Sequence, residues 1–288
     1  MHMRSLSAFA SMAIIGLTVP SIASAHPPVA LVMDQHGNVF YSDLSRVWMI
    51  APNGQKSIAV PNVHSHELFL DTDGTLYGEH VWYEGERANK WGHRVWKRTQ
   101  DGTITNVIPP TDGFLTGYSF VRDRVGTMYW AERLVRTEIR KRRAKGPVSI
   151  HSRGPFRDIR WMTASADGTL YLIDNGDLRK VLPDGTVSTV ALKIASRSIT
   201  RLNVGKQHSV MGLWLDSTSN VYAAIYGSGE VKRIAPDGTI TRVARSRLPW
   251  SPTGGMTASN GDLWILETSI TNAVRVRKVS RNGAVTTY

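Results

Sequence analysis

Short apolar runs alternate with turn residues along the whole chain, and residues 220–244 show the repeating unit most clearly. They read NVYAAIYGSGEVKRIAPDGTITRVA, with an apolar run at 221–225, a half-polar run at 230–234 and alternating polar and apolar residues at 239–243. Alternation with a period of two predicts half-buried β-strands. Pro236-Asp237-Gly238 predicts a tight turn, because Pro presets φ and Gly accepts a positive φ. With the apolar run at 211–215 as innermost strand, the stretch predicts a four-stranded antiparallel sheet.

Two series of turns repeat this unit six times. The first series follows each innermost strand, at Asp34-x-x-Gly37, Asp71-x-x-Gly74, Asp123-x-x-Gly126, Asp167-Gly168, Asp216-x-x-Ser219 and Asn260-Gly261. The second closes each third strand, at Pro52-Asn53-Gly54, Gln100-Asp101-Gly102, Ala144-Lys145-Gly146, Pro183-Asp184-Gly185, Pro236-Asp237-Gly238 and Arg281-Asn282-Gly283. A small sheet buries both its faces only when neighbours stack against it. The series therefore predicts an all-β fold, a six-bladed β-propeller with four antiparallel strands in each blade.

The expected domain organisation is a signal peptide followed by one propeller. Residues 1–25 have a positive start, an apolar stretch at 8–19 and an Ala23-Ser24-Ala25 cleavage site, which predicts a secreted or periplasmic protein that begins at His26. No second apolar run is long enough to span a membrane. The chain has no cysteine, so packing alone must hold the fold. The propeller is expected over 26–288, with blades at approximately 26–60, 61–108, 109–152, 153–191, 192–244 and 245–288.

Several phrases resemble a known group of propellers. Residues 261–267, 276–279 and 282–286 are similar to the repeat of the virginiamycin B lyase family, and residues 216–244 resemble NHL repeats and the gluconolactonase-like proteins. The resemblance covers residues 29–288 and implies the propeller fold. In the gluconolactonase-like group it also implies a calcium site built from Glu, Asn and Asp, and Met211 stands where that group has its Asp.

Strand direction divides the connections between two faces of the ring. Both turn series fall on one face, which we call the bottom face. The links between second and third strands, and those between blades, fall on the opposite face, the top face. The longest connections are expected on the top face, at Val81–His93, Pro109–Thr116, Leu192–Ser209 and Arg245–Thr253. Function in such rings resides in variable loops over a rigid scaffold.

A group of histidines and acids on the second blade is the strongest candidate site. His64 and His66 are two residues apart on an extended segment, so they project to the same side. The candidate metal ligands are His64, His66, Glu79, His80, His93 and, across the channel, His208. Imidazole and carboxylate groups suit a divalent ion such as Zn, Mn, Cu or Ca. The candidate catalytic residues are His66 and His80 as general bases, Glu67, and Arg160. Arg160 would orient an anionic substrate or pair with one of the acids that end the second strands, namely Asp43, Glu132, Asp174 and Glu267. The alternative for the whole group is surface hydrogen bonding and packing.

Two functions follow from these features. The first is an exported, divalent-metal-dependent hydrolase or lyase that acts on a small molecule at the top-face channel mouth. The second is a noncatalytic binding or assembly module for a protein, a polysaccharide or another anionic partner. The formal net charge of +12 favours an anionic neighbour, or serves only solubility. The basic run at 140–145 has no interleaved aromatic residues, so it gives no specific nucleic-acid signal. The protein is expected to be a monomer.

Overall fold

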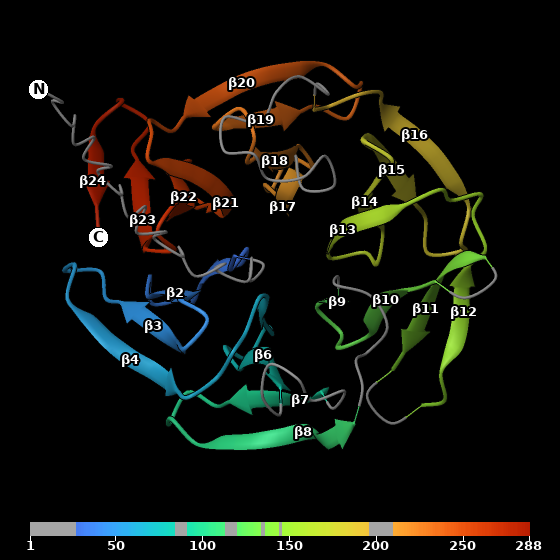
Figure 1. Ribbon diagram of the computed structural model, residues 1–288, viewed down its shortest axis with the longest axis horizontal. Helices are drawn as coiled ribbons and strands as arrows, with labels where there is room; N and C mark the ends of the chain where they lie inside the picture. The colour runs from blue at the N-terminus through green and yellow to red at the C-terminus, as the bar shows by residue number, and fades with distance from the viewer. Residues whose placement is uncertain (1–26, 84–90, 113–119, 134–135, 144–145, 196–209) are drawn as a thin grey trace, which may run out of the picture.

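Six four-stranded antiparallel sheets form a ring around a central channel, and each sheet uses four strands that are consecutive in the chain (Figure 1). This computed structural model describes residues 27–83, 91–112, 120–133, 136–143, 146–195 and 210–288. The architecture confirms the predicted six-bladed β-propeller. The first strand of each sheet lines the channel, and the fourth lies at the outer edge of the ring (Figure 1).

The six sheets are called blades 1 to 6 in chain order. Blade 1 contains β1 (Leu31–Met33), β2 (Val39–Ser42), β3 (Arg46–Ile50) and β4 (Lys56–Pro61). Blade 2 contains β5 (Leu68–Leu70), β6 (Leu76–Tyr83), β7 (Trp91–Arg98) and β8 (Ile104–Asp112). Blade 3 contains β9 (Phe120–Arg122), β10 (Met128–Arg133), β11 (Thr137–Arg142) and β12 (Ser149–Ser152).

The second half of the ring has the same organisation. Blade 4 contains β13 (Ile159–Ala164), β14 (Leu170–Asp174), β15 (Asp177–Val181) and β16 (Val187–Ala191). Blade 5 contains β17 (Val210–Leu215), β18 (Val221–Ile225), β19 (Glu230–Ile234) and β20 (Ile240–Arg245). Blade 6 contains β21 (Trp250–Thr257), β22 (Leu263–Ser269), β23 (Val274–Val279) and β24 (Val285–Thr287).

The bottom-face turns have the geometry that their residues predict. Gly238 has a φ of 87° and donates its N–H to the carbonyl of Ala235 at 2.9 Å. In the first turn of blade 5, Ser219 takes the position of the glycine with a φ of 63°. There the Asp216 carboxylate accepts the backbone N–H of Asn220 at 3.0 Å, and this bond helps to hold the strained turn.

The core lies between the blades, where facing sheets interdigitate. Trp96, Trp130, Trp214 and Trp264 are all buried, as expected for intersheet packing. Trp96 packs with side chains of blade 1, and Trp214 packs with Ile265 of blade 6. Within the described residues, no helix is long and apolar enough to cross a membrane.

The segment before β1 joins the two ends of the ring. The N–H groups of Val29 and Ala30 donate to the carbonyl of His66 in blade 2, at 3.0 and 3.3 Å. On the other side, Ala30 forms a parallel bridge with Gly255 of blade 6. The segment therefore lies between blades 2 and 6 on the inner side of the ring. Blade 6 packs against blade 1 to close the ring, and neither sheet borrows a strand from the other.

Candidate functional site

The two histidines that precede β5 lie against each other on the top face. The Nε2 atoms of His64 and His66 are 3.1 Å apart, and the rings meet edge to face with centroids 4.9 Å apart. This distance fits a hydrogen bond between two neutral rings. It is also close to the spacing of two ligands of one tetrahedral zinc ion, whose Zn–N bonds of about 2.1 Å place the nitrogens about 3.4 Å apart. Burial lowers the pKa of His64, which favours the neutral, ligating form.

His80 has a defined structural role in this region. Its Nδ1 accepts the backbone N–H of His64 at 2.8 Å. The proton of the neutral ring is therefore on Nε2, and Nδ1 is already used. Burial, followed by the charges of Arg94 and His64, lowers the pKa of His80 to about 4. His80 is thus a neutral ring that fixes the backbone of His64.

Glu79 and His93 lie on the opposite side of the blade 2 sheet from His80. The register of β6 and β7 pairs Glu79 with Val95 and Val81 with His93, whereas His80 pairs with Arg94. Residues directly opposite in an antiparallel pair share a face, and neighbours along a strand alternate. Val95 packs with Met128 of blade 3, so Glu79 and His93 face that blade. Burial raises the pKa of Glu79 to about 7.

The structure therefore separates most of the candidate metal ligands. It brings His64 and His66 together, places His80 beside them through its bond to the backbone, and directs Glu79 and His93 toward blade 3. Among the described residues, no three His, Asp or Glu side chains are arranged to hold one metal ion. His208 lies outside the described residues.

The candidate Arg160 pairs with an acid next to it. Its Nε donates to Asp158 at 2.8 Å. The acids that end the second strands are likewise engaged within the protein. Asp174 accepts the N–H of Asp158 at 2.7 Å, and Glu267, which is fully buried, accepts from Arg275 and Arg277 at 2.7 and 3.0 Å. These acids orient the top-face connections.

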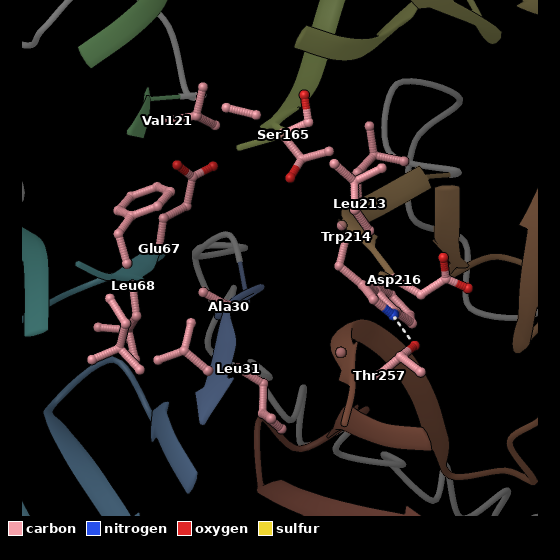
Figure 2. Close-up of a pocket in the computed structure, with 18 of the residues that line it drawn as sticks. Ala30, Leu31, Glu67, Leu68, Val121, Ser165, Leu213, Trp214, Asp216 and Thr257 are labelled. Atoms are coloured by element: carbon pink, nitrogen blue, oxygen red, sulfur yellow. Dashed lines mark hydrogen bonds between the residues drawn. The ribbon is translucent and has the colours of Figure 1, made fainter. Parts of the chain in front are cut away.

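The channel contains a cavity of about 710 Å³ (Figure 2). Its described lining runs from Val29 and Glu67 at the upper end to bottom-face turn residues such as Arg124 and Ser259. The cavity therefore reaches the bottom face, opposite to the His64–His66 pair. Its volume lies within the range of small-molecule sites.

The lining of the cavity mixes apolar and polar side chains, and its hydroxyl groups are concentrated on one side. Blades 1 to 3 contribute apolar side chains, including Leu31, Leu68 and Val121, together with the charged side chains of Glu67, Arg122 and Arg124. Blades 4 to 6 contribute hydroxyl groups, namely those of Thr163, Ser165, Ser217, Ser219, Thr257 and Ser259. Figure 2 shows Leu68 and Val121 across the open space from Asp216 and Thr257. Apolar side chains of blades 4 to 6, such as Leu213 and Trp214, also line the cavity, so it offers apolar contacts all round and hydroxyl groups on one side.

Glu67 is the candidate catalytic residue that belongs to this cavity. It is 7% exposed, and Figure 2 shows its carboxylate beside Val121. Its neighbour His66 contacts His64 and, through Nδ1, the carbonyl of Pro27 at 3.5 Å. The sequence analysis did not identify the hydroxyl groups on blades 4 to 6. The signal for them is a Ser or Thr at or just after the end of the innermost strand in blades 4 to 6, as at Ser165, Ser217 and Thr257.

Comparisons with known proteins show that this chain resembles several solved β-propellers in fold. Neither a family model nor a curated protein sequence matches the chain. Virginiamycin B lyase from Staphylococcus aureus is 15% identical, with a TM-score of 0.54 over 91% of this chain and 84% of the lyase. A gluconolactonase from Xanthomonas campestris is 11% identical, with a TM-score of 0.56 over 85% and 84% of the two chains. Regucalcin, a calcium-binding protein from Agrobacterium tumefaciens, is 15% identical, with a TM-score of 0.54 over 84% and 82%. These likenesses confirm that the chain has the β-propeller fold that its repeats predict, in common with the virginiamycin B lyase and gluconolactonase-like proteins.

Proposed function

We propose that the protein binds a small organic molecule inside the ring, in the cavity that reaches the bottom face. The observation that carries this proposal is the cavity of about 710 Å³, whose lining combines apolar side chains with hydroxyl groups on blades 4 to 6. A site of this volume holds a metabolite-sized ligand, and its few polar groups orient that ligand.

The lining favours an amphipathic ligand. An apolar face would pack against Leu68 and Val121, while polar groups would bond the hydroxyls of blades 4 to 6. Arg122 also lines the cavity, but it already donates to the Asp71 carboxylate at 3.2 and 3.0 Å and stacks on Tyr77. Arg124 is the exposed cation at the mouth and would attract a negatively charged end of the ligand.

A cavity-filling variant tests this proposal. A library of small amphipathic acids and alcohols would be screened by thermal shift, and each hit would be measured by titration calorimetry. Leu213→Trp places a large ring in the cavity and is expected to abolish binding, because Leu213 lines it. The control is Ile58→Trp on the outer strand β4, at a side chain that is 48% exposed. Equal affinity of Leu213→Trp and the unaltered protein for every hit would refute the cavity as the site.

The second candidate is a divalent-metal-dependent hydrolase or lyase on the top face. It is favoured by the 3.1 Å separation of the His64 and His66 Nε2 atoms, which suits two ligands of one ion. The remaining ligands would have to come from top-face connections outside the described residues. Elemental analysis after incubation with Zn²⁺, Mn²⁺, Cu²⁺ or Ca²⁺ tests it. Bound metal that disappears in the His64→Ala, His66→Ala double variant supports the candidate, and the absence of metal from the unaltered protein rejects it.

We also propose that the protein is exported after cleavage between Ala25 and His26. The positive start, the apolar stretch at 8–19 and the Ala23-Ser24-Ala25 site support this proposal. N-terminal sequencing of the protein from its native cells is the test. A mature protein that retains residues 1–25 would contradict it.

A further inference from the structure

Exposed charge is distributed unequally between the two faces of the ring. The described top-face connections and strand ends carry six exposed cationic side chains, at Arg136, Arg153, Arg157, Lys193, Arg245 and Arg247. None of these six forms an ion pair within the described residues, and Asp112 is the exposed acid on the same face. On the bottom face the described turns and strand ends carry exposed acids at Asp73, Asp101, Asp167, Asp184 and Asp237, and exposed cations at Lys56, Arg124, Arg143 and Arg281.

The sheet topology causes this polarity. The bottom-face turns other than Ala144-Lys145-Gly146 use Asp or Asn for their local backbone bonds, as Asp237 does when it accepts the N–H of Thr239 at 2.9 Å. Acids are therefore built into the bottom face by the turn chemistry. Top-face acids such as Asp174 and Glu267 are buried and paired with Arg179, Arg275 or Arg277. Among the described residues, exposed cations therefore outnumber exposed acids on the top face, whereas the two are nearly balanced on the bottom face.

Aliphatic side chains protrude between these cations. Leu192, next to Lys193, is 65% exposed, and Leu248, next to Arg247, is 53% exposed. Ile270 is 56% exposed, and its N–H donates to the carbonyl of Pro249 at 3.2 Å, so it lies beside the Leu248 segment. Exposing large aliphatic groups next to unpaired arginines gives a mixed apolar and basic surface.

We propose that the top face docks on an anionic lipid surface, with Leu248 and Ile270 entering the interface and the surrounding arginines contacting the headgroups. Basic residues near an anionic membrane each add to binding, and short apolar insertions add to this attraction. The aliphatic tips favour a lipid surface over a polyanion, because a polyanion offers them no apolar region. Docking by this face leaves the bottom-face mouth of the channel open to solvent.

Vesicle co-sedimentation tests whether the top-face arginines contribute to membrane binding. The unaltered protein is expected to bind vesicles of phosphatidylglycerol in phosphatidylcholine at about 0.1 M salt, and not pure phosphatidylcholine vesicles. The double variant Arg153→Gln, Arg247→Gln should bind about 25-fold more weakly, since each basic residue near the surface contributes roughly a five-fold factor. The matched control Arg143→Gln, Arg281→Gln removes the same charge from the bottom face and should bind within about two-fold of the unaltered protein. An equal loss of vesicle binding in both double variants would show that binding depends only on the net charge of the protein, and would overturn the proposal.

Variants of the exposed Leu248 and Ile270 distinguish binding to a lipid surface from binding to a polyanion. Leu248→Ser with Ile270→Ser should weaken vesicle binding about ten-fold, because partial burial of each side chain is lost. The same variant should elute unchanged from a heparin column, which senses charge alone. Circular dichroism and thermal unfolding would establish that each variant is folded. Retention on heparin without any binding to anionic vesicles would assign the face to a polyanion and reject the lipid proposal.

Discussion

His151 shows how a single buried side chain limits stability. It lies in β12, is 7% exposed and packs edge to face on Tyr129 at 5.1 Å. Neither ring nitrogen has a hydrogen-bond partner within the described residues, and burial lowers the pKa of His151 to about 4. A buried polar group without a partner costs about 1–3 kcal/mol relative to its hydrated state.

The variant His151→Phe is therefore expected to stabilise the protein. It keeps an aromatic ring against Tyr129 and removes the two unsatisfied nitrogens, so the free energy of unfolding at pH 7 should rise by about 1 kcal/mol. Urea unfolding followed by tryptophan fluorescence measures this change. His36→Phe in an exposed bottom-face turn serves as the control, with a change within about 0.5 kcal/mol. A loss of stability in His151→Phe would mean that packing of the larger ring dominates.

At the scale of the elements, the contact between β21 and the segment before β1 depends on a glycine. A Cβ added at Gly254 would lie 1.6 Å from the carbonyl oxygen of Val29. Backbone cannot yield by that amount without separating the two ends of the ring. Gly254 therefore permits the close approach that joins blade 6 to blade 1.

Gly254→Ala is expected to lower the free energy of unfolding by about 3 kcal/mol, because the added methyl group forces the strands apart. The matched control is Gly146→Ala, where the nearest atom would be the Cβ of Arg143 at 3.7 Å, an ordinary contact. Chemical denaturation of both variants, with limited proteolysis near residue 29, measures stability and loosening of the closure. Equal effects of the two substitutions would contradict this role for Gly254.

The fold and part of the candidate site were predictable because they depend on local patterns in the strands and turns. The fold was predictable because Asp, Pro and Gly recur at fixed places, and each repeat encodes the same local turns. The contact between His64 and His66 follows from their spacing of two in extended chain. The same alternation puts Glu79 and His80 on opposite sides of β6, which divides the proposed ligand set. The course of the channel cavity was not predictable, because it depends on tertiary contacts such as that of Val29 with Gly254.

For the molecule as a whole, the pKa values of His80, His151 and Glu79 are shifted far enough to make the free energy of unfolding depend on pH. Burial lowers the pKa values of His80 and His151 to about 4 and raises the pKa of Glu79 to about 7. In the unfolded chain these groups titrate near about 6.5 for His and about 4.3 for Glu. Between about pH 6.5 and pH 4, the histidines are protonated in the unfolded chain but remain neutral in the folded protein. Acidification therefore lowers the free energy of unfolding. Glu79 acts in the opposite sense, because the folded protein takes up its proton below about pH 7 and the unfolded chain does so only near about pH 4.3.

The two effects oppose each other between about pH 6.5 and pH 4.5. A variant that removes the Glu79 carboxyl should therefore expose the contribution of the histidines to the pH dependence of stability. In Glu79→Gln the free energy of unfolding should fall more steeply on acidification across this window than in the unaltered protein, since the compensating proton uptake is lost. In His151→Phe the free energy of unfolding should fall less steeply, because one of the histidines that oppose Glu79 is gone. Urea unfolding at several pH values within the window gives both slopes. Identical slopes in the unaltered protein and Glu79→Gln would show that Glu79 has the same proton affinity in the folded and unfolded states, and would reject burial of its carboxyl as the cause of the pH dependence.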